Sequence, residues 1–164
     1  MKKFLVVLLA LMALLSVSAM AETVDAFSSA SVADFYGASA LAGDDLMNAV
    51  NAQSGTYLVS TTNPDGSPNT AYFVFGIRKI DEKYYLQLGL AENQSKQNLI
   101  ANGKGLAVYA ANPSQEEGAK EYTVSGARIW FDTIADQAVV DALNAEVGRP
   151  GAMFYEIVEV RPLG

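Results

Sequence analysis

The feature that most constrains the fold is a series of short β-rich runs separated by strong turn signals. "TYLVSTT" (56–62) precedes "NPDGSPN" (63–69), in which two prolines and an Asp-Gly pair lie within seven residues. "TAYFVFGI" (70–77) and "YYLQLGL" (84–90) follow, separated by the polar "RKIDEK" (78–83). Apolar runs of this length between clusters of Gly, Pro and Asp are typical of β-hairpins. The sequence therefore predicts three strands in an antiparallel meander.

The rest of the chain alternates between helical and strand-like segments. Apolar residues at helical spacing, with capping residues at the ends, predict helices at 44–55, 93–102 and 137–148. Three further strands are predicted at 105–111, at 121–132, where Gly126 is interpreted as a bulge, and at 152–163. Six mostly antiparallel strands with flanking helices predict a mainly β domain, a closed or split β-barrel, because closure removes exposed edges. Side chains fill a barrel this small, so we expect any ligand on its outside, where two copies meet.

The first residues have the pattern of a secretory signal peptide. Lys2 and Lys3 precede an apolar run that ends in Ala-Met-Ala at residues 19–21, the small residues that a signal peptidase recognises. A retained anchor is the alternative, although the apolar run is short for a membrane span. We therefore expect a signal peptide at 1–21, an Ala/Ser-rich lead-in at 22–43 and one domain at 44–164. The mature protein is expected to be exported, either to the periplasm or out of the cell.

The charge of the chain argues against two classes of partner. The net charge is −7 and two lysines lie in the leader, so the mature protein carries about −9. Nucleic acid and anionic membranes need a basic face to bind phosphates. We therefore expect neither nucleic acid nor, beyond the signal peptide, a membrane as a partner.

The chain has no histidine and no cysteine. This excludes a Ser-His-Asp triad, a Cys-His pair, an ordinary zinc site and a haem held by either residue. The acidic residues show no EF-hand spacing, so no metal site is predicted. If the protein performs demanding chemistry, a bound organic cofactor is expected to supply it.

Ser95 and Lys96 open the helix predicted after the third strand. Free backbone N–H groups and the helix dipole favour an anion there, and a hydroxyl and an ammonium strengthen that preference. The same residues also fit a capping serine beside a solvated lysine. Both readings remain open from the local pattern.

Polar residues and glycines elsewhere allow similar alternatives. Asn69 and Thr70 begin the second strand, where they could bond the polar edge of a ligand or simply finish the turn. Gly76 and Gly89 could let a flat ring approach the backbone, or they could be bulges.

Taken together, the segments "GTYLVSTTNPDGSPNTAYFVFG", "KYYLQLGL", "QSKQNL", "GLAVYA" and "YTVSGARIWF" resemble the pyridoxamine 5'-phosphate oxidase-like, FMN-binding split-barrel proteins. The resemblance is greatest to the small single-domain FMN-binding members and covers roughly residues 45–160. It implies a six-stranded antiparallel split barrel that forms a homodimer and holds FMN at the subunit interface.

The resemblance also implies a set of cofactor-binding residues. The start of the second strand is expected to lie along the flavin, and the start of the short helix is expected to hold its phosphate. The implied residues are Asn69, Thr70, Ala71 and Tyr72 for the flavin, and Gln94, Ser95 and Lys96 for the phosphate.

The chain departs from the family pattern in several places. Many relatives have a lysine where this chain has Ser95, and its lysine comes one residue later. The arginine that the oxidases carry at the start of the second strand and their C-terminal Arg and His segment are missing, which discounts pyridoxamine phosphate oxidation. The haem-degrading branch depends on histidine, which this chain lacks. No catalytic residue is predicted, and the redox partner or substrate stays open.

Three functions are compatible with these residues. The first is an exported FMN-binding flavoprotein in electron transfer or flavin-dependent oxidoreduction. The second is a non-enzymatic protein that binds flavin or another phosphate-bearing small molecule. The third is a structural barrel without a ligand.

Overall fold

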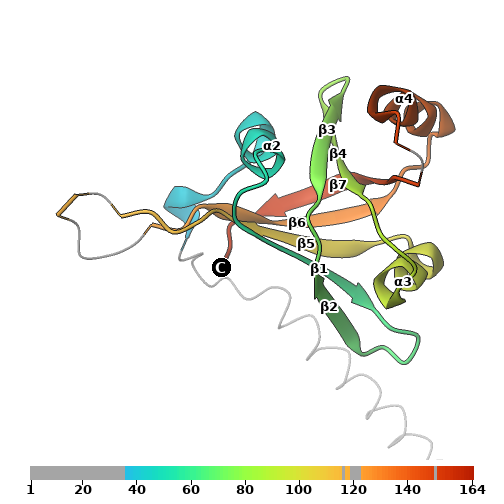
Figure 1. The fold of residues 1–164 in the computed structure, drawn as a ribbon, viewed down its shortest axis with the longest axis horizontal. Coiled ribbons are helices and arrows are strands. Elements are labelled where there is room, and N and C mark those ends of the chain that lie inside the picture. The colour runs from blue at the N-terminus through green and yellow to red at the C-terminus, as the bar shows by residue number, and fades with distance from the viewer. Residues whose placement is uncertain (1–35, 116, 119–122, 150) are drawn as a thin grey trace, which may run out of the picture. The chain divides into compact units, whose positions relative to one another are not determined.

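The computed structural model describes residues 36–115, 117–118, 123–149 and 151–164. Within these residues a 3-10 helix η1 (Gly37–Ser39) is followed by α2 (Gly43–Asn51), α3 (Gln94–Asn102) and α4 (Gln137–Val147). The strands are β1 (Thr56–Thr62), β2 (Pro68–Tyr72), β3 (Gly76–Ile80), β4 (Lys83–Leu88), β5 (Gly105–Ala110), β6 (Gly126–Thr133) and β7 (Met153–Arg161). Figure 1 shows the three α-helices at separate positions around the strands. The predicted signal peptide and most of the lead-in lie outside the described residues.

All seven strands form one antiparallel sheet in the order β2-β1-β5-β6-β7-β4-β3. The mainly β fold with flanking helices is confirmed. The predicted three-stranded meander is wrong, because β1 pairs with β2 and β3 pairs with β4, but β2 and β3 are separate strands. The strands β2 and β3 are consecutive in the chain, yet they form the two opposite edges of the sheet. The three residues between them carry the chain from one edge to the other.

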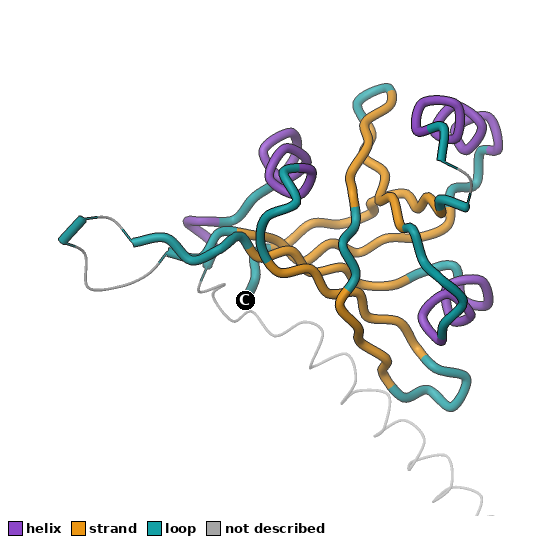
Figure 2. The backbone as a smooth tube through the Cα atoms, in the orientation of Figure 1, coloured by secondary structure: helices purple, strands orange, loops and turns teal. Residues whose placement is uncertain are grey.

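The predicted strand count was wrong because the run at 70–77 is not one strand. It breaks at residues 73–75, where Figure 2 shows a short loop between two strands. Phe75 is buried with 3% of its surface exposed, whereas Val74 beside it is 47% exposed. A continuous apolar run cannot reveal such a break, because both the strands and the crossing contribute apolar side chains to the core.

The interpretation of Gly126 as a bulge was also wrong. Gly126 begins β6 and pairs in register with Ala110, and the irregularity of that strand lies between Trp130 and Phe131. A Cβ at Gly126 would lie 2.2 Å from the carbonyl oxygen of Tyr109. A glycine is therefore needed there because another backbone passes very close.

The core is formed by the inward-facing residues of the strands together with one side of α2. Val59, Ala107 and Ile129 on three neighbouring strands are fully buried, and Val50 packs against the same cluster from α2. Tyr57 lies in this cluster and donates its hydroxyl to the Val50 carbonyl at 2.7 Å. In a smaller buried cluster, Leu143 of α4 packs with Tyr85 of β4, which holds the helix against the sheet.

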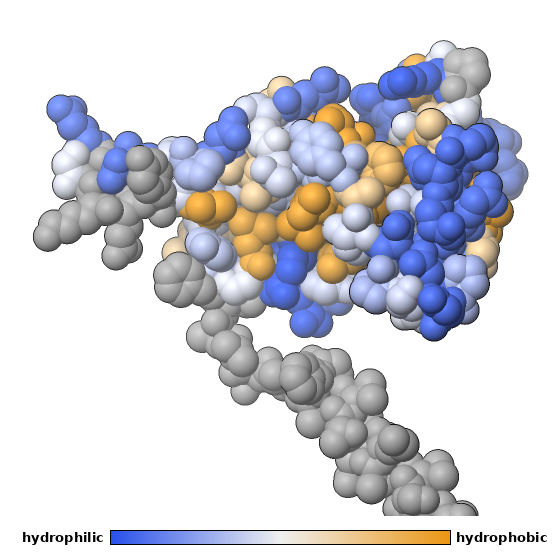
Figure 3. Space-filling view, turned by 60° about the horizontal axis from the view of Figure 1, so that its bottom comes forward, coloured by the Kyte–Doolittle hydropathy of each residue, from blue (hydrophilic) through white to orange (hydrophobic). Residues whose placement is uncertain are grey.

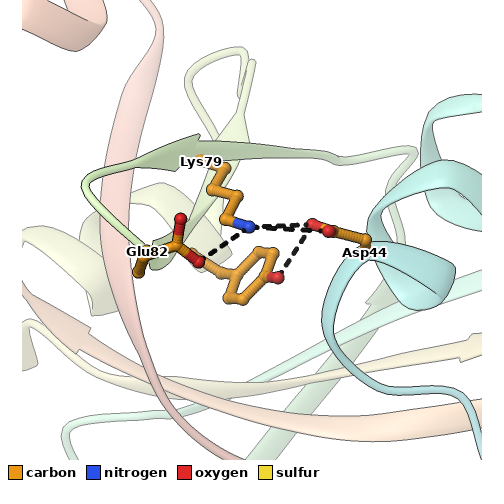
Figure 4. Close-up of polar contacts among 4 residues, drawn as sticks. Asp44, Lys79 and Glu82 are labelled. Atoms are coloured by element: carbon orange, nitrogen blue, oxygen red, sulfur yellow. Dashed lines mark hydrogen bonds and ion pairs between the residues drawn. The ribbon is translucent and has the colours of Figure 1, made fainter.

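A polar contact attaches the start of α2 to the β3–β4 hairpin (Figure 4). The Lys79 ammonium lies 3.2 Å from Asp44 Oδ1 and 3.0 Å from Glu82 Oε2. The Tyr84 hydroxyl donates to Asp44 Oδ1 at 2.8 Å. This hydrogen bond, followed by the one from Lys79, lowers the pKa of the Asp44 carboxyl. The contact stabilises the hairpin against the helix without involving the predicted site.

Among the described residues, no helix is long and apolar enough to cross a membrane.

Candidate functional site

The short helix α3 is held in place by a cap at each end. The Asn93 side chain accepts a hydrogen bond from the Lys96 N–H at 3.0 Å, so Asn93 is the N-terminal cap and Ser95 is not. Gly103 ends the helix with φ of 70° and donates its N–H to the Leu99 carbonyl. The Gln94 and Ser95 N–H groups have no acceptor among the described residues, as is usual in a first helical turn.

The two segments that the sequence assigned to the cofactor are joined by a direct hydrogen bond. Asn69 Nδ2 on β2 donates to Ser95 Oγ on α3 at 2.8 Å, and also to Thr61 Oγ1 on β1 at 3.1 Å. Asn98, one turn after Ser95, donates to the same Thr61 oxygen at 3.0 Å and to Asn63 Oδ1 at 2.9 Å. The start of the helix is therefore attached to both strands of the first hairpin.

This network is buried and internally satisfied. Ser95 and Asn98 are each 2% exposed and Thr61 is 5% exposed. Gln94 donates to Asn98 Oδ1 at 2.7 Å, which occupies the remaining side of that amide. No buried side-chain nitrogen or oxygen in the described part of the chain lacks a partner. The Ser95 hydroxyl thus positions α3, and the groups still open to a ligand are those on the surface of the helix start.

Lys96 does not extend into open solvent. Its ammonium forms an ion pair with Glu92, four residues earlier, and only 24% of its side chain is exposed. The hydrogen bond from Lys96, together with its charge, lowers the pKa of the Glu92 carboxyl. The sequence reasoning missed Glu92, although the four-residue spacing was visible. An anion bound at this helix start would lie near both charges.

The remaining predicted residues lie on β2. This strand pairs with β1 on one side only, so its other edge carries backbone groups without strand partners. The Thr70 hydroxyl lies 2.8 Å from the Ser60 hydroxyl, and Tyr72 at the end of the strand is 60% exposed. Ala71 pairs with the buried Val59. Thr70 therefore belongs to the opposite face of the hairpin from Asn69, because successive side chains alternate.

That opposite face continues across the sheet as a row of outward-pointing side chains. Thr70 pairs with Ser60, Ser60 with Leu106, and Leu106 with Trp130. A groove of about 350 Å³ lies along this row and is also lined by Lys104. Space-filling views show hydrophobic residues gathered in the middle of one face of the molecule, between hydrophilic regions (Figure 3).

Two guanidinium groups lie near the ring of Trp130. The guanidinium carbons of Arg128 and Arg161 are 5.8 Å and 5.4 Å from its ring centre. Cations over an indole face stabilise it in a partly exposed position.

The described residues contain no group of three or more His, Cys, Asp or Glu side chains that could hold a metal ion.

No known protein family model matches the sequence, and no curated protein is similar to it in sequence. Solved structures do share its fold. An FMN-binding protein from Syntrophomonas wolfei superposes with a TM-score of 0.51 at 15% identity, over 74% of this chain and 86% of the other. Flavoredoxin of Desulfovibrio vulgaris superposes with a TM-score of 0.45 at 13% identity, over 66% of this chain and 69% of the other. This similarity is too low to support the fold assignment. The predicted mainly β split-barrel fold is thereby confirmed, with seven strands in place of six.

Proposed function

We propose that the chain is an exported, homodimeric flavoprotein that binds FMN and acts in electron transfer or as a flavin-dependent oxidoreductase. The observation that carries this proposal is the hydrogen bond between Asn69 and Ser95. It brings together two segments 26 residues apart that the resemblance independently assigned to one cofactor. The shared fold with an FMN-binding protein supports the same choice of ligand.

The residues on the surface of the site fit the phosphate of FMN. Two N–H groups of the first turn of α3 have no acceptor in the described part of the chain, the helix dipole favours an anion, and the Lys96 ammonium lies in the same turn. The unpaired edge of β2 offers alternating N–H and C=O groups that suit the polar edge of a flavin ring. The Glu92 carboxylate, paired with Lys96, repels an anion at this helix start.

In this proposal the protein binds and orients while the cofactor reacts. When bound, the flavin supplies one- or two-electron redox chemistry. The buried network of Asn69, Ser95 and Asn98 holds α3 rigidly against the hairpin, so the phosphate donors keep a constant position relative to β2. Thr70 and Tyr72 present a hydroxyl and an aromatic ring near the outer edge of the same strand.

The outward-facing row of the sheet supports the homodimer. Leu106 and Trp130 are only half-buried in a single chain although they lie in the middle of a sheet. A second copy of the chain would cover them, and an isologous contact of this kind is the commonest dimer arrangement. Sedimentation analysis of the wild type should give a dimer, and Leu106→Glu should give a folded monomer. A monomeric wild type at micromolar concentration would contradict this part of the proposal.

Export rests on the pattern of residues 1–21 alone. Expression of the full chain in a bacterium, followed by N-terminal sequencing of the mature protein, should give Glu22 as the first residue. An intact N-terminus in the cytoplasmic fraction would exclude export.

The spectrum of the purified protein tests the central proposal. We expect either a yellow protein or quenching of FMN fluorescence on addition of the colourless protein. Lys96→Gln should weaken FMN binding about five- to tenfold while leaving riboflavin binding unchanged, since riboflavin lacks the phosphate. Lys83→Gln is the matched control, because that lysine pairs with Glu156 away from the site. A protein that neither contains nor binds FMN would refute the proposal.

The second candidate is a binding protein without catalytic turnover. The observation that favours it is the saturated network, in which every buried polar side chain is already paired within the described residues. Tight FMN binding, together with no reduction by nicotinamides and no electron transfer to common acceptors, would select this alternative. A structural barrel would instead show no binding at all.

A further inference from the structure

A further cavity has no residue of α3 in its lining. Its volume is about 580 Å³, and it is bordered by the end of α2, the crossing at residues 73–75, the start of β3 and the segment after α4. Volumes of roughly 300–1,000 Å³ are typical of pockets for small organic molecules. Its size alone therefore allows a ligand larger than a simple ion.

Two glycines leave part of the cavity wall without side chains. Gly76 pairs in register with Gln87, so it is not a bulge, and Gly89 directly follows β4. The three atoms nearest to a Cβ added at Gly89 would belong to the Arg149 guanidinium, at 3.9–4.0 Å, and a Cβ added at Gly76 would lie 3.4 Å from Asn51 Oδ1. The exposed side chain of Val74 borders the same space. A flat group with polar edges can therefore approach the backbone here.

The cavity is lined by two arginines, and one of them has no anionic partner among the described residues. Arg78 donates from Nε to Gln87 Oε1 at 2.8 Å, which fixes its guanidinium, and its ion pair with a described carboxylate is to Glu146 at 4.0 Å. Arg149 forms no ion pair with any described residue. By contrast, Lys79, Lys83, Lys96 and Arg161 each lie within 3.2 Å of a carboxylate.

Arg149 is exposed to solvent where it lines the cavity. The chain has 18 acidic and 11 basic residues, yet no carboxylate of a described residue forms an ion pair with Arg149. A guanidinium presents a planar fork of donors that matches a carboxylate or a phosphate. The donors of Arg149 are therefore available to an anion from outside the chain.

We propose that this cavity binds a small organic anion. Its flat body lies against Gly76 and Val74, and its carboxylate or phosphate pairs with Arg149 and Arg78. The proposal does not depend on flavin binding, although Val74 belongs to the crossing that directly follows the strand assigned to the flavin. If both proposals hold, an anionic substrate or electron carrier would lie next to that strand.

Amide NMR of the purified protein provides the test, with three naphthalene probes of similar shape. The probes are 1-naphthoate, 1-naphthyl phosphate and the neutral 1-naphthamide. At least one anion should shift the Gly76 and Gly89 amide signals in a saturable manner, and the neutral probe should bind roughly five- to tenfold more weakly. The stronger of the two anions identifies the class of headgroup.

Variants of the arginine separate this site from others. Arg149→Gln should weaken the anion to the level of the neutral probe, and Arg149→Lys should give an intermediate affinity because it keeps the charge but loses the fork. Lys104→Gln, at the other groove, is the control and should change nothing. Equal binding of the neutral probe, an unchanged affinity in Arg149→Gln, or shifts confined to residues 94–96 would overturn the proposal. Failure of FMN to bind would leave this result unaffected, so the two proposals fail separately.

Discussion

Glu92 provides a sharp prediction, because its removal should improve cofactor binding. In the structure its carboxylate neutralises the Lys96 ammonium, the only cation in the first turn of α3. The Glu92→Gln variant keeps the size of the side chain and removes the negative charge. If the FMN phosphate binds at this helix start, the variant should hold FMN more tightly than the wild type does.

The size of the effect follows from Coulomb's law. The Glu92 carboxylate, one residue before the N-cap, would lie about 7 Å from a phosphate of charge about −2, and the repulsion in water is reduced roughly by half through screening at physiological ionic strength. Its removal should raise the FMN affinity about two- to fivefold. Because 73% of the Glu92 side chain is exposed, the loss of the ion pair should hardly change the stability of the fold.

Titration of flavin fluorescence at low and high salt gives the measurement. The gain should be larger at low salt, and riboflavin should show no gain because it lacks the phosphate. Glu159→Gln is a suitable control, since Glu159 pairs with Arg161 on β7. An FMN affinity that falls, or that rises equally for riboflavin, would refute the placement of the phosphate beside Lys96.

Three further predictions concern the stability of the fold. Asn98→Ala removes three side-chain hydrogen bonds from a position that is 2% exposed. The free energy of unfolding, measured in urea, should therefore fall by about 2–4 kcal/mol. A loss below about 1 kcal/mol would contradict the role of the network. Asp81 and Glu82 have φ of 47° and 64° in the β3–β4 turn, a backbone conformation that asparagine and glycine adopt more readily. The double change Asp81→Asn with Glu82→Gly should therefore stabilise the protein by about 1 kcal/mol. A lower thermal midpoint in the double variant would argue against strain there. Burial raises the pKa of Tyr155 to about 12, so the folded state keeps its proton while the unfolded chain, with a pKa of about 10, loses it. Stability should therefore fall by about 2–3 kcal/mol from pH 10 to pH 12, and Tyr155→Phe should show a smaller fall over this range in urea unfolding followed by circular dichroism.

Much of the local structure was predictable because it depends on neighbouring residues. The Asp-Gly turn between Asn63 and Asn69 produced the first hairpin, and the apolar spacing in the short helix located α3. Asn93 and Gly103 have the residue types expected of helix ends, and both act as caps. These features require only the conformational preferences of a few consecutive residues.

The break between β2 and β3 was not predictable in the same way. Phe73 and Phe75 contribute to the core, as residues of a strand would, so the apolar pattern continues through the crossing. Only the order of the sheet, with these two strands at opposite edges, explains why the chain must leave the strand there. The exposed Val74 is the local consequence.

The candidate site was predictable in its parts but not in its contacts. The residue types at 69–72 and 94–96 suggested polar ligand-binding segments, yet the sequence left open whether Ser95 binds an anion or supports the helix. The structure assigns its hydroxyl to the hydrogen bond from Asn69 and pairs Lys96 with Glu92. The phosphate-binding role of these residues remains a prediction.

The amino-acid sequence by itself determined the helices, the turn chemistry, the strands apart from the break between β2 and β3, and the absence of histidine and cysteine chemistry, since each depends on local spacing or on composition. The tertiary structure decided which distant residues meet. It placed Asn69 against Ser95, moved β3 to the far edge of the sheet, and left Arg149 over a cavity beside Gly89. Such contacts arise from how the sheet curves and closes, and no local pattern in the chain specifies them.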